Sequence, residues 1–390
     1  MLKERYLTNA IFEDLRSKMV FLGGARQVGK TTLAQKLVAS RFSNHAYFNW
    51  DYRPDRKKLM NQELPANAEL LILDEIHKYG NWKNFLKGLY DKHKEKYKFL
   101  ITGSARLNIY RRGGDSLLGR YHYYTLHPFS LAEILKKRNS FKPFEPLEIA
   151  SQNYCDDYLL LEKFGGFPEV LLKQNERFLR RWHLERIERL FREEIRDLTA
   201  IRDLSQMQLL VDMLPERVGS LLSVNALRED LEISHKTLNM WMEILEWFYY
   251  HFRIYPFHLK TVRSLKKMPK LYLVDWSDIE NEAARFENIV ASHLLKFVDY
   301  LKEYEEFNAQ LWYLRGTEKR EVDFLITVDK KPWFSVEAKL QDTNISRHLL
   351  YFKERLNIPF NYQVIKKAEV DFIKDNIRVV SVDRFLSALV

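Results

Sequence analysis

The sequence contains a single cysteine, Cys155, among 390 residues. One cysteine excludes a disulfide framework and a cysteine-rich zinc site, and it fits a reducing compartment. No apolar run approaches the roughly 18 residues that a membrane-spanning helix needs. Residues 1–20 are rich in charge and lack the apolar stretch of a secretion signal. These absences predict a cytoplasmic protein that does not enter a membrane.

The chain also lacks low-complexity segments and internal repeats. Hydrophobic residues make up 46% of it and aromatic residues 14%, which is enough for sizeable cores. Its length predicts several domains rather than one. Lys and Arg number 63 against 53 Asp and Glu, so the formal net charge is +10. This excess favours an anionic partner, nucleic acid first.

Short apolar runs alternate with amphipathic stretches in residues 1–135. We expect a helix at 31–40 and strands at 19–24, 45–50, 69–75, 97–104 and 121–128. Apolar strands joined by helices are typical of a parallel sheet covered on both faces. The sequence therefore predicts an α/β fold for this first domain. The other predicted domains are a helical lid or linker at 136–205, three helices and a hairpin at 206–275, and an α/β segment at 276–390.

A phosphate-binding loop lies between the first strand and the first helix of this domain. Residues 24–31 match the pattern G-x-x-x-x-G-K-[ST] in full. Such a loop turns its backbone N–H groups around a phosphate at the positive end of a helix. Lys30 would reach the β- and γ-phosphates, and Thr31 would bind Mg²⁺. The predicted ATP-binding residues here are Gly24, Ala25, Arg26, Gln27, Val28, Gly29, Lys30, Thr31 and Thr32.

The second half of a nucleotide site follows at residues 70–75. An apolar strand ends there in Asp74 and Glu75. We expect Asp74 to hold Mg²⁺ and Glu75 to polarise the attacking water. The next strand ends at Ser104, for which two interpretations stay open: a hydroxyl that senses the γ-phosphate, or an ordinary turn after a strand.

The order of phosphate loop, Asp-Glu strand and polar strand resembles the AAA+ class of P-loop ATPases. This resemblance implies an arginine before the fifth strand that completes the site of a neighbouring subunit, and so a homo-oligomer. Arg120 stands in that place, with Arg111 and Arg112 as alternatives. Such an arginine would stabilise charge on the γ-phosphate during hydrolysis. The other interpretation of Arg120 is a surface residue without a catalytic role.

Residues 223–241 have the spacing of two short helices and a turn that is typical of a helix-turn-helix, with Ser234 as the N-cap of the second helix. Leu238, Trp241, Met242 and Leu245 would face inward on that helix, leaving His235, Lys236 and Asn239 outside. A basic hairpin follows, with Lys260, Arg263, Lys266, Lys267 and Lys270. This winged-helix pattern is suited to DNA phosphates. A packing or protein-interaction role is the alternative.

The last segment carries a second candidate site. Two strands joined by a short turn would place Asp323 beside Glu337 and Lys339. Two carboxylates can hold a metal ion that polarises a phosphate and activates water. The pattern resembles the restriction-endonuclease-like PD-(D/E)xK nucleases, although Val322 replaces the proline of that motif. The resemblance implies that Asp323 and Glu337 bind Mg²⁺, that Lys339 activates water, and that the helical Glu287 joins the metal ligands.

As a whole, the sequence resembles prokaryotic AAA+ family ATPases that carry a C-terminal domain of uncharacterised role. The resemblance implies ATP binding and hydrolysis and brings no substrate. One hypothesis is an ATPase coupled to a Mg²⁺-dependent nuclease that acts on DNA. Another is an ATP-switched DNA- or protein-binding factor whose nuclease-like domain is inactive. A third is a solitary ATPase whose basic surface meets RNA or acidic proteins.

Overall fold

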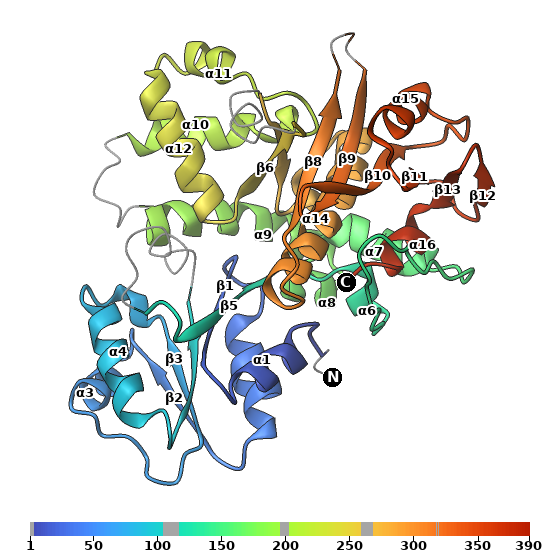
Figure 1. The fold of residues 1–390 in the computed structure, drawn as a ribbon. Helices are drawn as coiled ribbons and strands as arrows, with labels where there is room; N and C mark the ends of the chain where they lie inside the picture. Colours follow the sequence, from blue (N-terminus) through green and yellow to red (C-terminus); the bar gives the residue numbers. More distant parts are fainter. Residues whose placement is uncertain (1–3, 104–116, 196–202, 259–267, 317, 319) are drawn as a thin grey trace. The chain divides into compact units, whose positions relative to one another are not determined.

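The computed structural model describes residues 4–103, 117–195, 203–258, 268–316, 318 and 320–390. They form two compact units, which Figure 1 shows in ribbon form. The N-terminal unit comprises Met1–Pro128 and Trp247–Tyr249, and the C-terminal unit comprises Phe129–Glu246 and Tyr250–Val390. The predicted residues Ser104, Arg111, Arg112, Lys260, Arg263, Lys266 and Lys267 lie outside the described part of the chain.

The N-terminal unit is built on a five-stranded sheet with the order β2-β3-β4-β1-β5. Every neighbouring pair of strands is parallel, which confirms the predicted parallel α/β sheet. All residues of β1 and β3 are buried, as expected for strands covered on both faces. The strands are β1 (Met19–Gly24), β2 (His45–Asn49), β3 (Leu70–Asp74), β4 (Lys98–Thr102) and β5 (Tyr121–Leu126).

Helices α3 (Arg53–Met60) and α4 (Trp82–His93) cover one face of this sheet, and α1 (Thr8–Asp14) packs beside β1 (Figure 1). Trp82 and Leu86 of α4 join strand residues in one buried cluster. The helix expected at 31–40 is present. It begins as α2 (Lys30–Thr32) and continues as the π-helical η1 (Leu33–Val38) and the short 3₁₀ helix η2 (Ala39–Arg41). A second short 3₁₀ helix, η3 (Ile76–Lys78), follows β3.

The C-terminal unit begins with helices and continues into a large sheet. Ser234 accepts a hydrogen bond from the backbone N–H of Thr237, at 3.1 Å, at the start of the second helix of the predicted helix-turn-helix. The helices before the sheet are α6 (Leu131–Ile134), α7 (Cys155–Phe164), α8 (Pro168–Lys173), α9 (Glu176–Arg189), η5 (Leu190–Ile195), α10 (Leu204–Met213), η6 (Pro215–Arg217), α11 (Val224–Asp230) and α12 (His235–Trp247). The expected inward stripe of α12 is buried, and His235 and Lys236 are exposed.

The sheet of this unit has eight strands in the order β12-β13-β11-β10-β9-β8-β6-β7. Strands β8, β9 and β10 are successively antiparallel, and β10 runs parallel to β11. The strands are β6 (His251–Pro256), β7 (Lys270–Leu273), β8 (Ala309–Arg315), β9 (Glu321–Val328), β10 (Lys331–Lys339), β11 (Phe360–Ile365), β12 (Asp371–Lys374) and β13 (Ile377–Ser381). The helices of this part are η7 (Trp276–Asp278), α14 (Glu282–Glu303), α15 (Arg347–Leu356) and α16 (Val382–Ser387).

The hairpin that ends the predicted 206–275 segment belongs to the same sheet as the strands after residue 276. Strand β6 pairs in parallel with β8, through Tyr255 and Trp312, so the hairpin β6–β7 extends the C-terminal sheet. Helix α14 also packs against β7, and Asn288 of α14 exchanges two hydrogen bonds with the backbone of Leu273. The hairpin therefore lies where its side chains can reach the last third of the chain.

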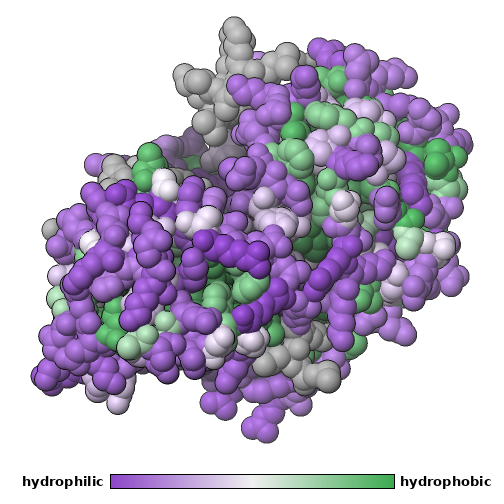
Figure 2. Space-filling view, turned by 60° about the horizontal axis from the view of Figure 1, so that its bottom comes forward, coloured by the Kyte–Doolittle hydropathy of each residue, from purple (hydrophilic) through white to green (hydrophobic). Residues whose placement is uncertain are grey.

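The surface agrees with the composition. Hydrophilic residues dominate the face drawn in Figure 2, and hydrophobic side chains on it form small separate patches. No helix in the described ranges is long and apolar enough to cross a membrane.

Candidate nucleotide site and carboxylate cluster

The phosphate loop follows β1 and closes onto the start of α2. Gly24 has φ +133°, and a Cβ there would lie 2.4 Å from the Leu126 carbonyl oxygen, so the close approach of β5 requires glycine. Gly29, with φ +100°, precedes the first residue of the helix. Lys30 is buried, and its Nζ donates to the carbonyl oxygens of Gly24 and Ala25 at 3.0 and 2.8 Å. The loop thus holds the ammonium group of Lys30 inside its own turn.

Asp74, at the end of β3, is the centre of a hydrogen-bond network beside this loop. Thr31 Oγ1 donates to its Oδ2 at 3.1 Å, which brings together the two predicted Mg²⁺ ligands. Tyr47 of β2 donates to the same oxygen at 2.7 Å, and Thr102 of β4 donates to Oδ1 at 2.6 Å. Burial is the main cause that raises the pKa of Tyr47, and the hydrogen bond to Asp74 raises it further. The hydroxyl therefore stays protonated and remains a donor.

Sequence reasoning missed Tyr47 and Thr102. Thr102 belongs to the same polar strand end as Ser104. The sequence predicts that this strand end lies near the nucleotide, but it does not single out Thr102. Tyr47 stands in an aromatic strand without a motif. Its role depends on the parallel pairing of β2 with β3, which sets Tyr47 opposite Ile72 and near Asp74.

Tyr47 offers a test of this network. We expect Tyr47→Phe to keep ATP binding and to lower ATP turnover about tenfold, with a higher Mg²⁺ requirement, because Asp74 loses a donor that orients it. Turnover measured across a Mg²⁺ titration checks this, with the exposed Tyr52→Phe as the matched control. An unchanged Mg²⁺ dependence in Tyr47→Phe would show that the hydroxyl only fills space.

Glu75 follows Asp74 in a left-handed backbone conformation, with φ +58°. Its Oε2 lies 3.5 Å from His77 Nε2 and 3.6 Å from Lys78 Nζ. Burial raises the pKa of Glu75, and the positive charge of Lys78 opposes that shift. The carboxylate thus lies just past the end of β3, directly after Asp74.

Arg120 lies at the opposite edge of the same sheet from the phosphate loop. Its carbonyl oxygen accepts from the N–H of Met19, at the start of β1, whereas the loop follows the end of that strand. Its guanidinium forms two hydrogen bonds with Asp91, at 2.9 and 3.1 Å. The structure therefore does not bring Arg120 to the loop of its own chain, and a catalytic role would require a neighbouring subunit.

The second predicted site gathers residues from α14, β9 and β10 in the C-terminal unit. Asp323 Oδ2 accepts from the backbone N–H of Ala338 at 3.0 Å, which fixes it beside Glu337 and Lys339. Lys339 Nζ lies 2.7 Å from Glu337 Oε1. Glu287 accepts from the Tyr272 hydroxyl at 2.8 Å. We call Glu287, Glu321, Asp323 and Glu337 the carboxylate cluster.

Lys270 lies among these acids, which corrects its predicted place on an exposed basic hairpin. It is 2% exposed, because β7 packs against α14 and lies in the same sheet as β9. Its Nζ lies 2.7 Å from Glu321, 3.2 Å from Asp323 and 3.3 Å from Glu287. The three carboxylates raise its pKa against the effect of burial. Sequence reasoning also missed Glu321, although residues two apart on a strand share a face.

Burial and the charge of Asp323 perturb two acids of the cluster, Glu287 and Glu337. Burial, followed by the charge of Asp323, raises the pKa of Glu287 to about 7. The same two causes raise the pKa of Glu337 to about 8. Glu337 is 4% exposed, and its Oε2 has no hydrogen-bond partner among the described residues. Such perturbed, buried acids are typical of functional sites.

Carboxylate oxygens are the ligands that Mg²⁺ prefers, so the cluster fits that ion in chemistry. The unpartnered Glu337 Oε2 leaves one buried acceptor to be satisfied. As the described residues stand, however, no three acidic, histidine or cysteine side chains are arranged to hold a metal ion. The ammonium of Lys270 lies between the oxygens of Glu287 and Asp323 instead.

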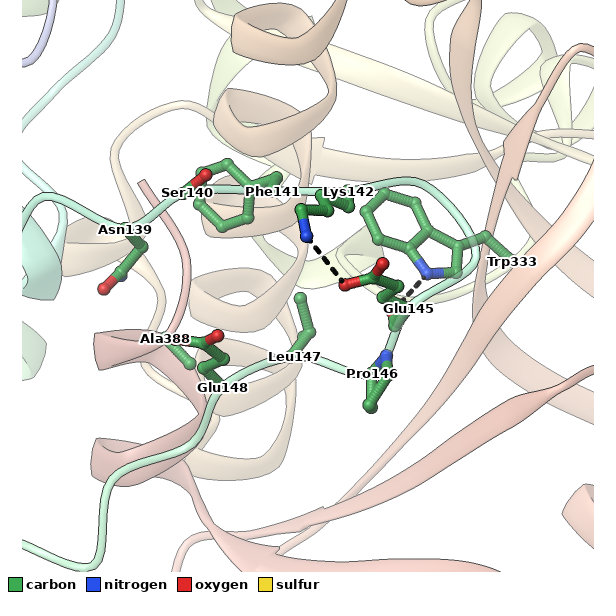
Figure 3. A pocket seen from close by; sticks show the side chains of 10 residues that line it. All are labelled: Asn139, Ser140, Phe141, Lys142, Glu145, Pro146, Leu147, Glu148, Trp333 and Ala388. Carbon is green, nitrogen blue, oxygen red and sulfur yellow. Dashed lines mark hydrogen bonds and ion pairs between the residues drawn. The ribbon is translucent and has the colours of Figure 1, made fainter.

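A small cavity elsewhere in the C-terminal unit does not form a site. It lies under the loop at 139–148 and beside Trp333 (Figure 3). Its volume is about 60 Å³, far below the roughly 300 Å³ of a small-molecule pocket. The Trp333 indole donates to the Glu145 carbonyl oxygen at 2.8 Å, so the loop is tied down across it.

Comparison with known families agrees with the geometry of the nucleotide site. Residues 16–135 match the family model described as an AAA domain. Residues 155–277 and 283–385 match two families described as domains of unknown function, DUF8612 and DUF4143. The protein therefore carries a P-loop AAA ATPase domain followed by domains of unknown function.

Proteins related along much of the chain include an uncharacterized protein, MJ1544, of Methanocaldococcus jannaschii. It is 25% identical over 93% of this chain and 87% of its own. The uncharacterized protein Rv2008c of Mycobacterium tuberculosis is 21% identical, over 67% of this chain and 55% of its own.

Solved structures that are similar to the chain include two ATPases. The Walker-type ATPase PABY2304 of Pyrococcus abyssi has 15% identity and a TM-score of 0.42, over 70% of this chain and 94% of that one. The RuvB Holliday junction branch migration motor of Thermotoga maritima has 16% identity and a TM-score of 0.31, over 64% of this chain and 90% of that one.

Proposed function

We propose that this protein hydrolyses ATP in its AAA domain and couples hydrolysis to a Mg²⁺-dependent nuclease-like site that acts on DNA. The observation that carries the second half is the convergence of the buried Glu337 and the partly buried Glu287 and Asp323 with the half-exposed Lys339. These residues come from a helix and from two neighbouring antiparallel strands. Nothing in ordinary packing favours burying so many acids together.

The nuclease chemistry would rest on Asp323, Glu337 and Glu287 as metal ligands. A bound Mg²⁺ would polarise the scissile phosphate and lower the pKa of a water molecule. Asp323 is oriented by the backbone N–H of Ala338. Lys339 is half-exposed and stays charged, because Glu337 raises its pKa against the effect of burial. An ammonium so placed can orient a water molecule or stabilise a phosphate oxygen.

The ATPase half of the proposal assigns Lys30 and Thr31 to the phosphates and Mg²⁺, Asp74 to Mg²⁺ and Glu75 to the attacking water. Arg120 would act on a neighbouring subunit, which makes the active species a homo-oligomer. DNA would meet the exposed face of α12, where His235 and Lys236 lie. A net charge of +10 supports an anionic partner.

The test is a cleavage assay on duplex and single-stranded DNA with Mg²⁺ or Mn²⁺, with and without ATP. We expect Glu337→Gln to lose cleavage and keep ATP hydrolysis, and Lys30→Ala to lose ATP hydrolysis and alter cleavage. The exposed Glu354→Gln, in the same unit, is the matched control and should behave as wild type. Cleavage that survives Glu337→Gln would contradict the proposal.

A second candidate is an ATP-switched DNA- or protein-binding factor whose nuclease-like domain is inactive. The position of Lys270 favours it, because its ammonium already forms ion pairs with three of the four carboxylates of the cluster. Intact ATP hydrolysis, together with the absence of cleavage under every metal and nucleotide condition, would support this candidate over the first.

A further inference from the structure

Lys270 contacts two of the three acids that are proposed as metal ligands. Its Nζ donates to Glu287 Oε1 and to Asp323 Oδ1, and it also forms an ion pair with Glu321. The lysine comes from the hairpin β6–β7, whereas the acids come from α14 and β9. A segment distant from β9 in the sequence thus supplies a cation to the cluster.

This position is fixed by the packing of β7. Leu273, three residues further along, exchanges two backbone hydrogen bonds with the side chain of Asn288, at 2.7 and 2.8 Å. Tyr272 donates to Glu287, and Gly219 donates to the carbonyl oxygen of Leu271. A Cβ on Gly219 would lie 3.3 Å from the Glu287 carboxylate oxygens, so the chain passes close to the cluster. These contacts of Leu271, Tyr272 and Leu273 hold the strand that carries Lys270 in place.

The ammonium and a divalent cation compete for the same oxygens. A Mg²⁺ ion binds carboxylate oxygens at about 2.1 Å. An ion held by Glu287 Oε1 or Asp323 Oδ1 would then lie at most about 5.4 Å from Lys270 Nζ, which is itself 3.2 to 3.3 Å from those oxygens. Two cations that close repel strongly where water is excluded, as around the buried Lys270, whereas solvent screens the half-exposed Lys339.

The unpartnered side-chain oxygen of Glu337 also supports a cation site at the cluster. Glu337 is 4% exposed, and its Oε2 has no hydrogen-bond partner in the described part of the chain. A buried oxygen without a donor is costly, and a cation at the cluster would satisfy it. Lys270 contacts the other three acids of the cluster and leaves this one incomplete.

We infer that Lys270 is a resident cation that holds the carboxylate cluster without metal, and that a divalent ion binds there only by displacing it. This inference rests on the proposed assignment of the cluster as a metal site. Lys270 then determines the metal affinity of the site, and the hairpin that carries it couples the middle of the chain to the C-terminal acids.

The experiment measures binding of Mn²⁺ alone to the full chain without nucleotide, for wild type, Lys270→Met and Lys270→Gln. We expect both variants to bind Mn²⁺ at least about tenfold more tightly than wild type, because the competing charge is gone. The double variant Lys270→Met with Glu337→Gln should lose that gain, which places the ion at the cluster.

Thermal unfolding provides a readout that is independent of activity. Lys270→Met should unfold at a lower temperature than wild type without metal, and Mn²⁺ should restore it. Lys296→Met is the matched control, since Lys296 is also 2% exposed and is bonded to Glu133 in the same unit. It should lose stability without recovery in Mn²⁺, because its ion pair with Glu133 lies outside the carboxylate cluster.

The outcomes separate this inference from the proposed function. Equal Mn²⁺ affinity in wild type and both Lys270 variants overturns the inference, even if wild type cleaves DNA. Tighter binding in the variants without DNA cleavage supports the inference and contradicts the nuclease. If neither variant folds with or without Mn²⁺, Lys270 serves stability alone and the inference is overturned.

Discussion

Glu75→Gln should lower ATP turnover by about 10²- to 10³-fold and leave ATP binding nearly unchanged. The amide has the same shape as the carboxylate but cannot accept a proton or polarise water in the same way. Glu75 directly follows Asp74 at the end of β3, whereas Lys30 and Thr31 belong to the phosphate loop that is proposed to bind ATP. Removing it should therefore affect hydrolysis rather than binding.

Steady-state turnover and binding of a fluorescent ATP analogue measure the two effects separately. Lys30→Ala is the contrasting variant and should lose binding as well as turnover. The exposed Glu63→Gln serves as the control for a change of one surface charge in the same unit. Turnover within a few-fold of wild type in Glu75→Gln would reject the assigned role.

Acidification from pH 6.5 to 4.5 should cost the C-terminal unit about 2 kcal/mol through His293 alone. His293 is 1% exposed, its Nε2 accepts from the backbone N–H of Leu131 at 3.1 Å, and its Nδ1 donates to the Ile289 carbonyl oxygen at 2.8 Å. Both ring nitrogens are thus used by the neutral form. A second proton on Nε2 would point at another donor.

The sign follows from the pKa. Burial lowers the pKa of His293 to about 3, and the positive charge of Lys296 adds to that effect, whereas Glu133 and the bond to Ile289 oppose it. The unfolded chain therefore takes up the proton near the ordinary pKa of about 6.5, and the folded chain takes it up only near 3. The stabilisation is complete above pH 6.5 and is lost as the pH falls toward 3.

Chemical denaturation at several pH values checks this. His293→Leu should be less stable than wild type at pH 7, because it loses two hydrogen bonds. The difference between the two proteins should shrink by about 2 kcal/mol between pH 6.5 and 4.5. The exposed His235→Gln is the control and should parallel wild type. A constant difference between His293→Leu and wild type would contradict the assigned pKa.

Much of the AAA domain could be predicted from the sequence because its signals are local. Five apolar runs mark the five strands, and the phosphate loop must stand between a strand and a helix. Asp74 ends strand β3, as the sequence predicts, and Glu75 follows it directly. Tyr47 and Thr102 could not be assigned in the same way. They reach Asp74 only because β2 and β4 flank β3 in the sheet.

The carboxylate cluster divides along the same line. Asp323, Glu337 and Lys339 could be predicted to lie together, since two strands joined by a short turn must pair. Lys270 belongs to a basic stretch, and its charge pattern alone indicates a solvated hairpin. Its burial follows from the pairing of β6 with β8 and from the packing of α14 on β7.

The sequence by itself determined the chemistry available to this protein: a phosphate loop, a pair of acids after an apolar strand, and a set of acids with a lysine near the C-terminal end. Only the tertiary structure decided which charges meet. Local motifs specify residue types within a turn or two of the chain. The meeting of Lys270 with Glu287 and Asp323 depends on long-range strand order and helix packing, which no short stretch of sequence encodes.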